Sequence, residues 1–154
     1  MHLPSIYDEA YHRYRHFPLE ALQEQVERES RRALLWVTES KERFLASRDW
    51  STLRVLECGG GLGGLSLHLA RLSADVSLVD VAPTALEVAR RLGERTGLKV
   101  KTECLDLGRP VESKLGRFDI IVDSHLLHCL ATPPERASYH QFLKDHLATG
   151  GIVI

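Results

Sequence analysis

A run of glycines between an apolar segment and an amphipathic one constrains this chain more than any other feature. Residues 53–58, Leu-Arg-Val-Leu-Glu-Cys, have the length and apolar content of a buried parallel strand. Five glycines follow, at 59–61, 63 and 64, and residues 65–72 then have helical spacing. Glycine lets a chain turn sharply and lets its backbone approach a ligand closely. We therefore predict a nucleotide-binding turn, since a merely flexible loop would not need a strand before it and a helix after it.

Beyond the glycine turn, the sequence alternates between strand and helix patterns. This alternation predicts an α/β fold with a parallel sheet, covered on both faces by helices in right-handed crossovers. Pro83 stands where a helix begins, and Gly97 stands where it ends. The expected elements after the first strand are a helix over 63–73, a strand over 75–80, a helix over 84–92, a strand over 98–104, a strand over 118–123, a helix over 134–147, and a strand over 152–154 that follows a turn at Gly150 and Gly151.

Before the sheet, residues 19–46 predict one long helix. Leu22 and Val26 belong to an apolar stripe, and the other face carries pairs of opposite charge such as Glu24 with Arg28. Such a charged face is solvated, so we do not expect a binding site on it.

Composition excludes several classes of partner. The 154 residues, 44% hydrophobic and 27% charged, provide for one hydrophobic core. A net charge of −1 gives no broad attraction for nucleic acid or anionic lipid, and the sequence has no signal peptide or membrane-spanning run. The three cysteines, Cys58, Cys104 and Cys129, have no paired spacing and indicate free thiols. We therefore expect a cytoplasmic protein that binds neither nucleic acid nor membrane.

Acidic residues stand at the ends of the predicted strands. Glu57 ends the first strand, Asp80 the second and Asp123 the fourth, while Asp106 lies just past the third. Any one of these is more often a solvated or capping carboxylate than a site residue. In a doubly wound sheet, however, ligands bind beyond the carboxyl ends of the strands. Acidic strand ends beside a glycine turn therefore predict a binding site.

Asp80 indicates the kind of ligand. It lies about twenty residues after the glycine turn, where a carboxylate can accept hydrogen bonds from both hydroxyls of an adenosine ribose. NAD-binding domains share this feature. Glu57 stands directly before the glycines, and Asp106 is placed to accept from an adenine amino group, and both favour a different adenosyl ligand.

With these residues, the chain resembles the class I S-adenosylmethionine-dependent methyltransferases over residues 53–154. The family's first motif, an acidic residue followed by three alternating glycines, is met by Glu57, Gly59, Gly61 and Gly63. The resemblance implies a doubly wound, mostly parallel, Rossmann-like sheet in strand order 3-2-1-4-5, with a helical extension before it. It also implies a sixth and a seventh strand that this chain lacks, so we interpret the chain as truncated after its fifth strand.

We expect residues 1–46 to form a helical cap or lid and residues 53–154 to form the cofactor-binding domain. Tyr7, Tyr11 and Tyr14 are spaced to lie on one helical face. One interpretation of this face is aromatic packing on the sheet. Similar segments close over the cofactor in relatives, and we choose Tyr11 as the residue that stabilises the sulfonium, by a cation–π attraction of about 0.5–2 kcal/mol.

The resemblance implies S-adenosylmethionine as cofactor, S-adenosylhomocysteine as product, and roles for individual residues. Glu57 would hold the methionine amino group, often through water, and Asp80 would bind the ribose. The other expected contacts are the backbone of Gly59, Gly60 and Gly61 against the ligand, Val81 against the adenine ring, Asp106 and the Leu107 backbone at the adenine edge, and Asp123 at the end of the fourth strand.

The methyl acceptor is expected to be a small molecule. Residues 118–130 resemble the fourth-strand region of small-molecule methyltransferases, and residues 147–154 resemble their turn into strand five. The Asn/Asp-Pro-Pro-aromatic motif of enzymes that methylate DNA bases or glutamine is absent after the fourth strand, as is the Pro-Cys nucleophile of the cytosine-carbon enzymes. We predict transfer by direct in-line displacement, in which the protein aligns the acceptor and excludes water.

Two histidines follow the fourth strand, on the side of the departing methyl group in this fold. We name His125 and His128 as candidate catalytic residues that orient or deprotonate the acceptor, although His128 is equally consistent with a packed helix residue. Together with Cys129 they lack the ligand spacing of a structural zinc site, so we predict no metal.

Two other functions remain open from the sequence. An NAD-dependent oxidoreductase would share the glycine turn and Asp80, although the later part of the chain has no Tyr-x-x-x-Lys pair. A non-catalytic interaction module would keep the fold without the reaction. Whichever function holds, a second copy of the chain could pair along the exposed edge of the sheet to form a homo-oligomer.

Overall fold

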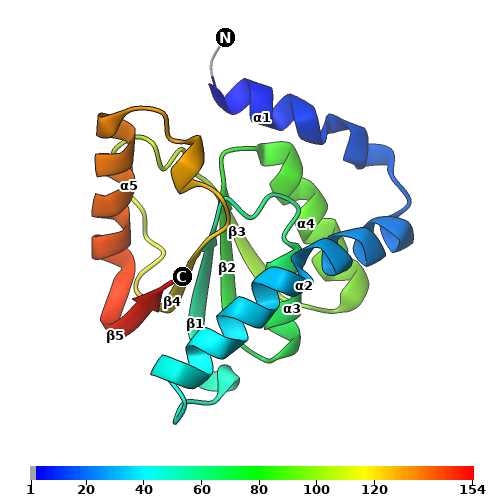
Figure 1. Ribbon diagram of the computed structural model, residues 1–154. Helices are drawn as coiled ribbons and strands as arrows, with labels where there is room; N and C mark the ends of the chain where they lie inside the picture. Colours follow the sequence, from blue (N-terminus) through cyan, green and yellow to red (C-terminus); the bar gives the residue numbers. More distant parts are fainter. Residues whose placement is uncertain (1–2) are drawn as a thin grey trace.

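The centre of the structure is a parallel sheet whose strand order matches the expected one. The computed structural model describes residues 3–154, so Met1 and His2 of the expected N-terminal segment lie outside the described residues. The five strands follow the order β3-β2-β1-β4-β5 (Figure 1), which confirms the predicted fold class. The strands are β1 (Arg54–Cys58), β2 (Asp75–Asp80), β3 (Val100–Cys104), β4 (Phe118–Asp123) and β5 (Leu147–Val153).

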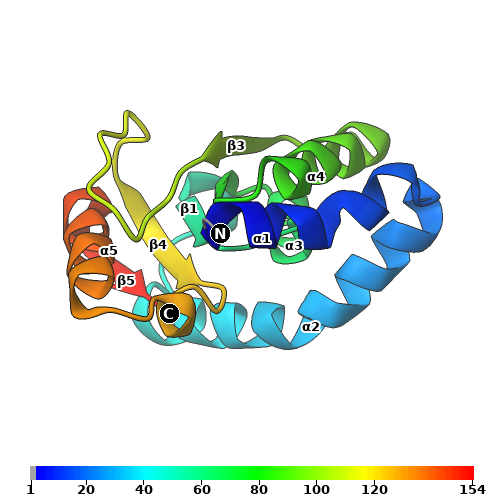
Figure 2. The ribbon, with the colours of Figure 1, turned by 90° about the horizontal axis from the view of Figure 1, so that it is seen from above.

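Helices cover both faces of this sheet (Figure 2). The helices α2, α3 and α4 pack on one face and α5 packs on the other, while α1 crosses the edge where the strands end. The helices are α1 (Leu3–Tyr11), α2 (Leu19–Phe44), α3 (Gly64–Arg71), α4 (Pro83–Thr96) and α5 (Pro133–His146), and the short 3₁₀ helices are η1 (His12–His16), η2 (Trp50–Thr52) and η3 (Leu127–Cys129).

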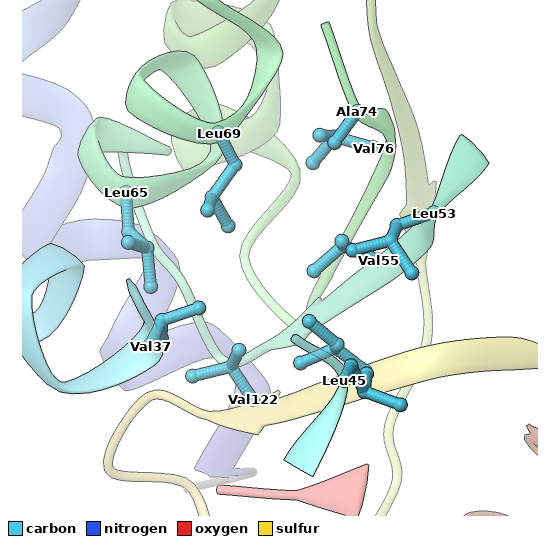
Figure 3. Close-up of a cluster of buried hydrophobic side chains, with 10 residues drawn as sticks. Val37, Leu45, Leu53, Val55, Leu65, Leu69, Ala74, Val76 and Val122 are labelled. Carbon is cyan, nitrogen blue, oxygen red and sulfur yellow. The ribbon is translucent and has the colours of Figure 1, made fainter. Parts of the chain in front are cut away.

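Alternate side chains of the central strand β1 fill the two layers. Val55 lies beneath α2 and α3, where it packs with Val76 of β2 (Figure 3). Ile120 of β4 belongs to the same buried cluster. Leu56 points to the opposite face and packs beneath Tyr139 of α5. Burying an aliphatic side chain of this size contributes about 1.5–3 kcal/mol. The apolar run predicted for the first strand therefore holds β1 in the middle of the sheet, and with it the glycine turn at its carboxyl end.

The connection between β3 and β4 is a loop without a helix. Residues 105–117 have no helix or strand, but Leu107 is only 2% exposed and packs in the layer beneath α5. Phe142 of α5 belongs to the same buried cluster. This layer is thus formed by one helix and one well-anchored loop.

The predicted turn at Gly150 and Gly151 is wrong. Strand β5 runs through both glycines, and its pairing with β4 shifts register between Phe118 and Ile120. Gly150 has a φ of +76°, a left-handed conformation that a glycine adopts without strain. The glycines therefore lie in an irregularity within the strand, as in a β-bulge, and do not precede it.

The prediction of one helical face for three tyrosines is also wrong. Helix α1 ends at Tyr11, and Tyr14 lies in η1, where the chain tightens into a 3₁₀ helix. Tyr14 packs against the buried cluster that contains Leu22, although its ring centroid remains 6.3 Å from that of Tyr11. Tyr7 and Tyr11 remain on α1 and point toward the carboxyl edge of the sheet.

None of the helices within residues 3–154 combines the length and the apolar character needed to cross a membrane. The cysteines are free thiols: Cys58 is buried, Cys104 is exposed and Cys129 is partly buried.

Candidate functional site

The glycine turn after β1 presents bare backbone at the carboxyl edge of the sheet. Gly59 and Gly61 have φ angles of +73° and +53°, in the left-handed region where a side chain causes strain. Gly60 has no such φ, but a Cβ there would overlap the side chains of Glu57 and Leu78. Glycine is therefore required at three successive positions, for two different reasons.

Asp80, the last residue of β2, binds this turn directly. Its Oδ2 accepts a hydrogen bond from the N–H of Gly61 at 2.9 Å, and its Oδ1 accepts one from the N–H of Ala82 at 2.9 Å. Burial raises the pKa of Asp80, and its backbone hydrogen bonds oppose that rise. A carboxylate offers about four lone-pair sites, so Asp80 still has acceptor capacity for a ligand hydroxyl.

Val81 follows Asp80 at the same edge. Its carbonyl oxygen lies 3.6 Å from the Sγ of Cys104, the last residue of β3. The backbone N–H of Leu105 donates to the carbonyl oxygen of Asp80 at 3.1 Å. The ends of β2 and β3 are thereby held together, with Val81 between them.

Glu57 is buried beneath the turn and has protein partners on both oxygens. Its Oε2 accepts from the N–H of Ser66 at 3.0 Å and from the Ser66 hydroxyl, and its Oε1 accepts from the Ser124 hydroxyl at 2.8 Å. The residue is 2% exposed. Burial raises the pKa of Glu57, and the serine hydrogen bonds partly offset the rise. Its carboxylate thus connects α3 to the segment after β4.

Asp106 lies in the loop after β3 and is bonded within that loop. Its Oδ1 accepts from the N–H of Gly108 at 3.1 Å, and its Oδ2 lies 3.1 Å from the Nε of Arg109. Gly108 in turn lies against the side chains of Leu130 and Glu135. The Asp106 loop therefore packs beside the start of α5. The Asp106 side chain is one-third exposed.

Asp123 organises the segment that carries the two candidate histidines. Its Oδ1 accepts from the N–H of Leu126 at 2.9 Å, and its Oδ2 accepts from the N–H of Leu127 at 3.1 Å. The rings of His125 and His128 meet edge to face, with centroids 5.3 Å apart, and both residues are exposed. His125 has a φ of +67°, which is uncommon for a residue other than glycine.

Helix α1 crosses this edge of the sheet (Figure 2), and its last residue, Tyr11, lies against the glycine turn. The Tyr11 hydroxyl would lie 2.5 Å from a Cβ built on Gly61. Burial and then the charge of Asp80 raise the pKa of Tyr11 to about 12. One turn earlier, Tyr7 faces Cys129, whose thiol and charge both raise the pKa of Tyr7. Helix α1 thus reaches from the glycine turn to the segment after β4.

Several predicted site residues therefore meet at one place. The charge of Asp80 acts on both Glu57 and Tyr11, which places these groups around the glycine turn. Burial raises the pKa of the Cys58 thiol, at the end of β1, and the nearby charge of Asp123 adds to the rise. Asp106 makes its hydrogen bond and ion pair inside its own loop.

Two serines at this site were not predicted from the sequence. Ser66 lies in the first turn of α3, and Ser124 directly follows Asp123. A serine has no pattern of its own that identifies a buried carboxylate as its partner. Its place next to a strand end or a glycine turn was the only available signal.

Within residues 3–154 no three side chains of histidine, cysteine, aspartate or glutamate are grouped so that they could hold a metal ion. The site consists of a glycine turn, carboxylates from neighbouring strands and a tyrosine above them.

Comparison with known families identifies the group to which this arrangement belongs. A family described as "Methyltransferase domain" matches residues 55–151, which include the glycine turn and the ends of β1, β2 and β4. The chain belongs to the class I S-adenosylmethionine-dependent methyltransferases.

Curated methyltransferases show the same relationship in sequence. The chain is 34% identical over 105 residues to a ubiquinone biosynthesis O-methyltransferase of Cereibacter sphaeroides, covering 66% of this chain and 40% of that protein. It is 47% identical over 82 residues to the protein of the same name from Methylocella silvestris, covering 53% of this chain and 32% of that protein. The chain thus spans less than half the length of these relatives.

A solved methyltransferase-fold structure agrees with this assignment at the level of the fold. The structure of PKMT2 from Rickettsia typhi in complex with AdoHcy superposes with a TM-score of 0.60 at 20% identity, covering 68% of this chain and 20% of that one. S-adenosylmethionine is the cofactor of the family that the match over residues 55–151 identifies.

Proposed function

We propose that this chain forms the cofactor-binding part of an S-adenosylmethionine-dependent O-methyltransferase that acts on a hydroxyl group of a small molecule. The observation that carries the proposal is the Gly59–Gly61 backbone, which lies between carboxylates from two neighbouring strands. Asp80 hydrogen-bonds to this backbone, and Glu57 lies directly beneath it. When bound, S-adenosylmethionine supplies a methyl group activated by the positive charge on sulfur.

The residues present fit this cofactor. Backbone without side chains is what a bulky adenosyl amino acid needs for close approach, and Asp80 keeps acceptor capacity for ribose hydroxyls. Val81 is placed to contact the adenine ring, and Asp106 and the Leu107 backbone to contact its edge. We assign Glu57 a less direct role than the family resemblance implies, because it is only 2% exposed and already accepts three hydrogen bonds from two serines.

The acceptor side is formed by the segment after β4. Asp123 holds that segment through backbone N–H groups, and exposed His125 and His128 lie there next to each other. Either imidazole can take the proton of an acceptor hydroxyl, since imidazole is the side chain that most often serves as a general base. The relatives that bear the name O-methyltransferase support oxygen as the acceptor atom.

The remaining contribution of the protein is alignment. Holding acceptor and donor in line can lower the barrier by about 7–11 kcal/mol. We propose that residues 1–46 supply the cover over this arrangement and residues 53–154 the domain beneath it, with Tyr11 against the sulfonium. We further propose a cytoplasmic protein that does not bind nucleic acid and that pairs with a second copy along β5, the edge strand of the sheet.

A non-catalytic methyltransferase-like module is the second candidate. The observation that favours it is the Tyr11 hydroxyl, which lies against Gly61 at the place where a cofactor would approach. A module of this kind would leave Tyr11 in place permanently. An NAD-dependent oxidoreductase has no comparable support, because the family match is to methyltransferases.

Calorimetric titration distinguishes these candidates. Wild-type chain should bind S-adenosylhomocysteine and not NAD, and Asp80→Ala should abolish the binding because it removes the ribose acceptor. Asp75→Ala is the matched control, since it removes the same side chain from the exposed opposite end of β2. Binding of NAD alone would support the oxidoreductase, and absence of binding to either ligand would support the module. Unchanged S-adenosylhomocysteine affinity in Asp80→Ala would overturn our assignment of the site.

A further inference from the structure

Asp8 of α1 caps a helix that begins far away in the sequence. Its Oδ1 accepts a hydrogen bond from the N–H of Thr84, in the first turn of α4, at 2.7 Å. Helix α4 has no cap of its own, because its N-cap residue is Ala82, which makes no side-chain hydrogen bond. A carboxylate at this position satisfies a free N–H group and interacts favourably with the positive end of the helix dipole. Asp8 of α1 therefore supplies the side-chain cap that Ala82 cannot provide.

Other contacts hold the same segment on α4. The hydroxyl of Thr84 accepts from Arg15 at 3.0 Å, and the carbonyl oxygen of Arg15 accepts from Arg91 at 2.7 Å. Arg15 also lies 3.6 Å from Glu87. The side chains of Arg15 and Glu87 are 43% and 45% exposed, whereas the Asp8 side chain is 20% exposed and accepts from a backbone N–H of the first turn. Asp8 is thus the contact at the beginning of α4 itself.

Tyr11 lies three residues after Asp8, so the two side chains project from the same face of α1. Tyr11 reaches the glycine turn at Gly61 while Asp8 reaches α4. Asp80 connects the two places that these side chains reach, since it accepts from the N–H of Gly61 and from the N–H of Ala82, the residue just before α4. The start of α4, Asp80 and the glycine turn therefore form one connected unit, and Asp8 sets where α1 lies upon it.

We propose that Asp8 is a positioning residue of the cofactor site, which caps α4 from α1 and thereby places Tyr11 over Gly61. The inference rests on the proposed function, because it gives the position of Tyr11 a consequence for the cofactor. Asp8 does not touch the ligand in this scheme. It acts through the placement of α1, so its loss should affect how tightly and how long the ligand is held.

The test compares Asp8→Ala, Asp8→Asn and Glu9→Ala in the whole chain. Glu9→Ala is the matched control, because Glu9 is the exposed neighbour of Asp8 on α1 and its substitution also removes one negative charge. Asp8→Ala should weaken binding of S-adenosylhomocysteine by about 2- to 30-fold, the factor equivalent to losing one helix cap, and should speed its release. Asp8→Asn should retain most of the affinity, since its amide oxygen can still accept from Thr84.

Two further measurements separate positioning from a general effect. Hydrogen exchange of the ligand-free protein should show faster exchange of the Thr84 amide and of α1 in Asp8→Ala but not in Glu9→Ala. In a Tyr11→Ala background, Asp8→Ala should cause little additional loss of affinity, because the group that it positions is gone. If Asp8→Ala unfolds below the assay temperature, Asp8→Glu replaces it, since the longer side chain keeps the charge and displaces α1.

The outcomes are distinct from those for the proposed function. If wild type fails to bind S-adenosylhomocysteine, the proposed function fails, and the exchange experiment still decides whether Asp8 holds α1. If wild type binds and Asp8→Ala binds equally well, or if its effect simply adds to that of Tyr11→Ala, the positioning role is overturned. Equal losses in Asp8→Ala and Glu9→Ala would also overturn it, because charge alone would then account for the effect.

Discussion

Ser124 and Glu57 are joined by a hydrogen bond of 2.8 Å from the serine hydroxyl to the buried carboxylate. Ser124 follows β4 and Glu57 belongs to β1, and these are the neighbouring strands between which the chain changes direction across the sheet. Ligands of doubly wound sheets bind at that position. The bond therefore connects the glycine turn to the segment with the candidate histidines. A substitution that disorders one of these segments should also alter the structure of the other.

Removing this hydroxyl should destabilise the protein. In Ser124→Ala, Glu57 Oε1 loses the partner that the structure gives it, and a buried acceptor left without one costs about 1–3 kcal/mol. Urea unfolding followed by circular dichroism measures the change. Ser47→Ala is the control, since Ser47 is exposed in the link before η2, and it should alter stability very little. Equal stability of Ser124→Ala and wild type would mean that the bond contributes nothing in solution.

Steric overlap of a Cβ and a positive φ angle are two different reasons for glycine, and they can be tested separately. Gly60→Ala places a Cβ against Glu57 and Leu78, and such overpacking costs about 1–3 kcal/mol. Gly97→Ala places a Cβ in open space but at a φ of +68°, so it costs only backbone strain of about 1–2 kcal/mol. Thermal unfolding should show both losses. Only Gly60→Ala should also weaken S-adenosylhomocysteine binding, and similar binding by both variants would contradict this view of the turn.

Sequence patterns predicted the elements whose bounds depend on residues that are adjacent in the chain. The strands 75–80 and 118–123 have their predicted bounds because an apolar run, once it lies inside a parallel sheet, ends where charged or turn residues begin. The glycine turn was predictable because strand, glycines and helix are adjacent in sequence. Helix α4 extends to Thr96, beyond the predicted 92, since its last turn continues up to Gly97, the residue that ends it.

Contacts between distant residues could not be predicted in this way. Asp8 and Thr84 are 76 residues apart, and Ser124 and Glu57 are 67 apart. No spacing rule connects such pairs, because their proximity depends on how complete layers pack. The Gly150 irregularity is missed for a related reason: a glycine pair has the same sequence in a turn and in a bulge, and the partner strand decides between them.

The buried carboxylate of Glu57 should leave a signature in the pH dependence of stability. Burial raises its pKa above the ordinary value of 4.5, so the folded protein binds a proton more tightly than the unfolded chain does. The contribution of Glu57 is therefore most favourable below that ordinary value and decreases as the pH rises toward the folded-state pKa. Glu57→Gln removes this contribution. The stability of wild type relative to Glu57→Gln, measured by urea unfolding, should fall as the pH rises from acid, and a flat or rising difference would contradict the raised pKa.

Asp123 should control the order of the candidate acceptor segment. Two short 3₁₀ helices offer a matched comparison: Asp123 precedes η3 and accepts from backbone N–H groups, whereas Asp49 precedes η2 and makes no side-chain cap. Asp123→Ala should cost about 0.5–2 kcal/mol, the usual value of a lost cap, and Asp49→Ala should cost much less. Hydrogen exchange should become faster at Leu126 and Leu127 in Asp123→Ala, because those amides lose their acceptor.

The same variant shows whether order in this segment matters to the cofactor. If the Ser124–Glu57 hydrogen bond couples the segment after β4 to the glycine turn, Asp123→Ala should weaken S-adenosylhomocysteine binding as well as speed hydrogen exchange after β4. If binding is unchanged while exchange increases, the segment after β4 serves the acceptor alone, and the coupling inferred from the 2.8 Å bond is refuted. Asp49→Ala should change neither quantity, since its side chain holds no backbone group that leads to the site.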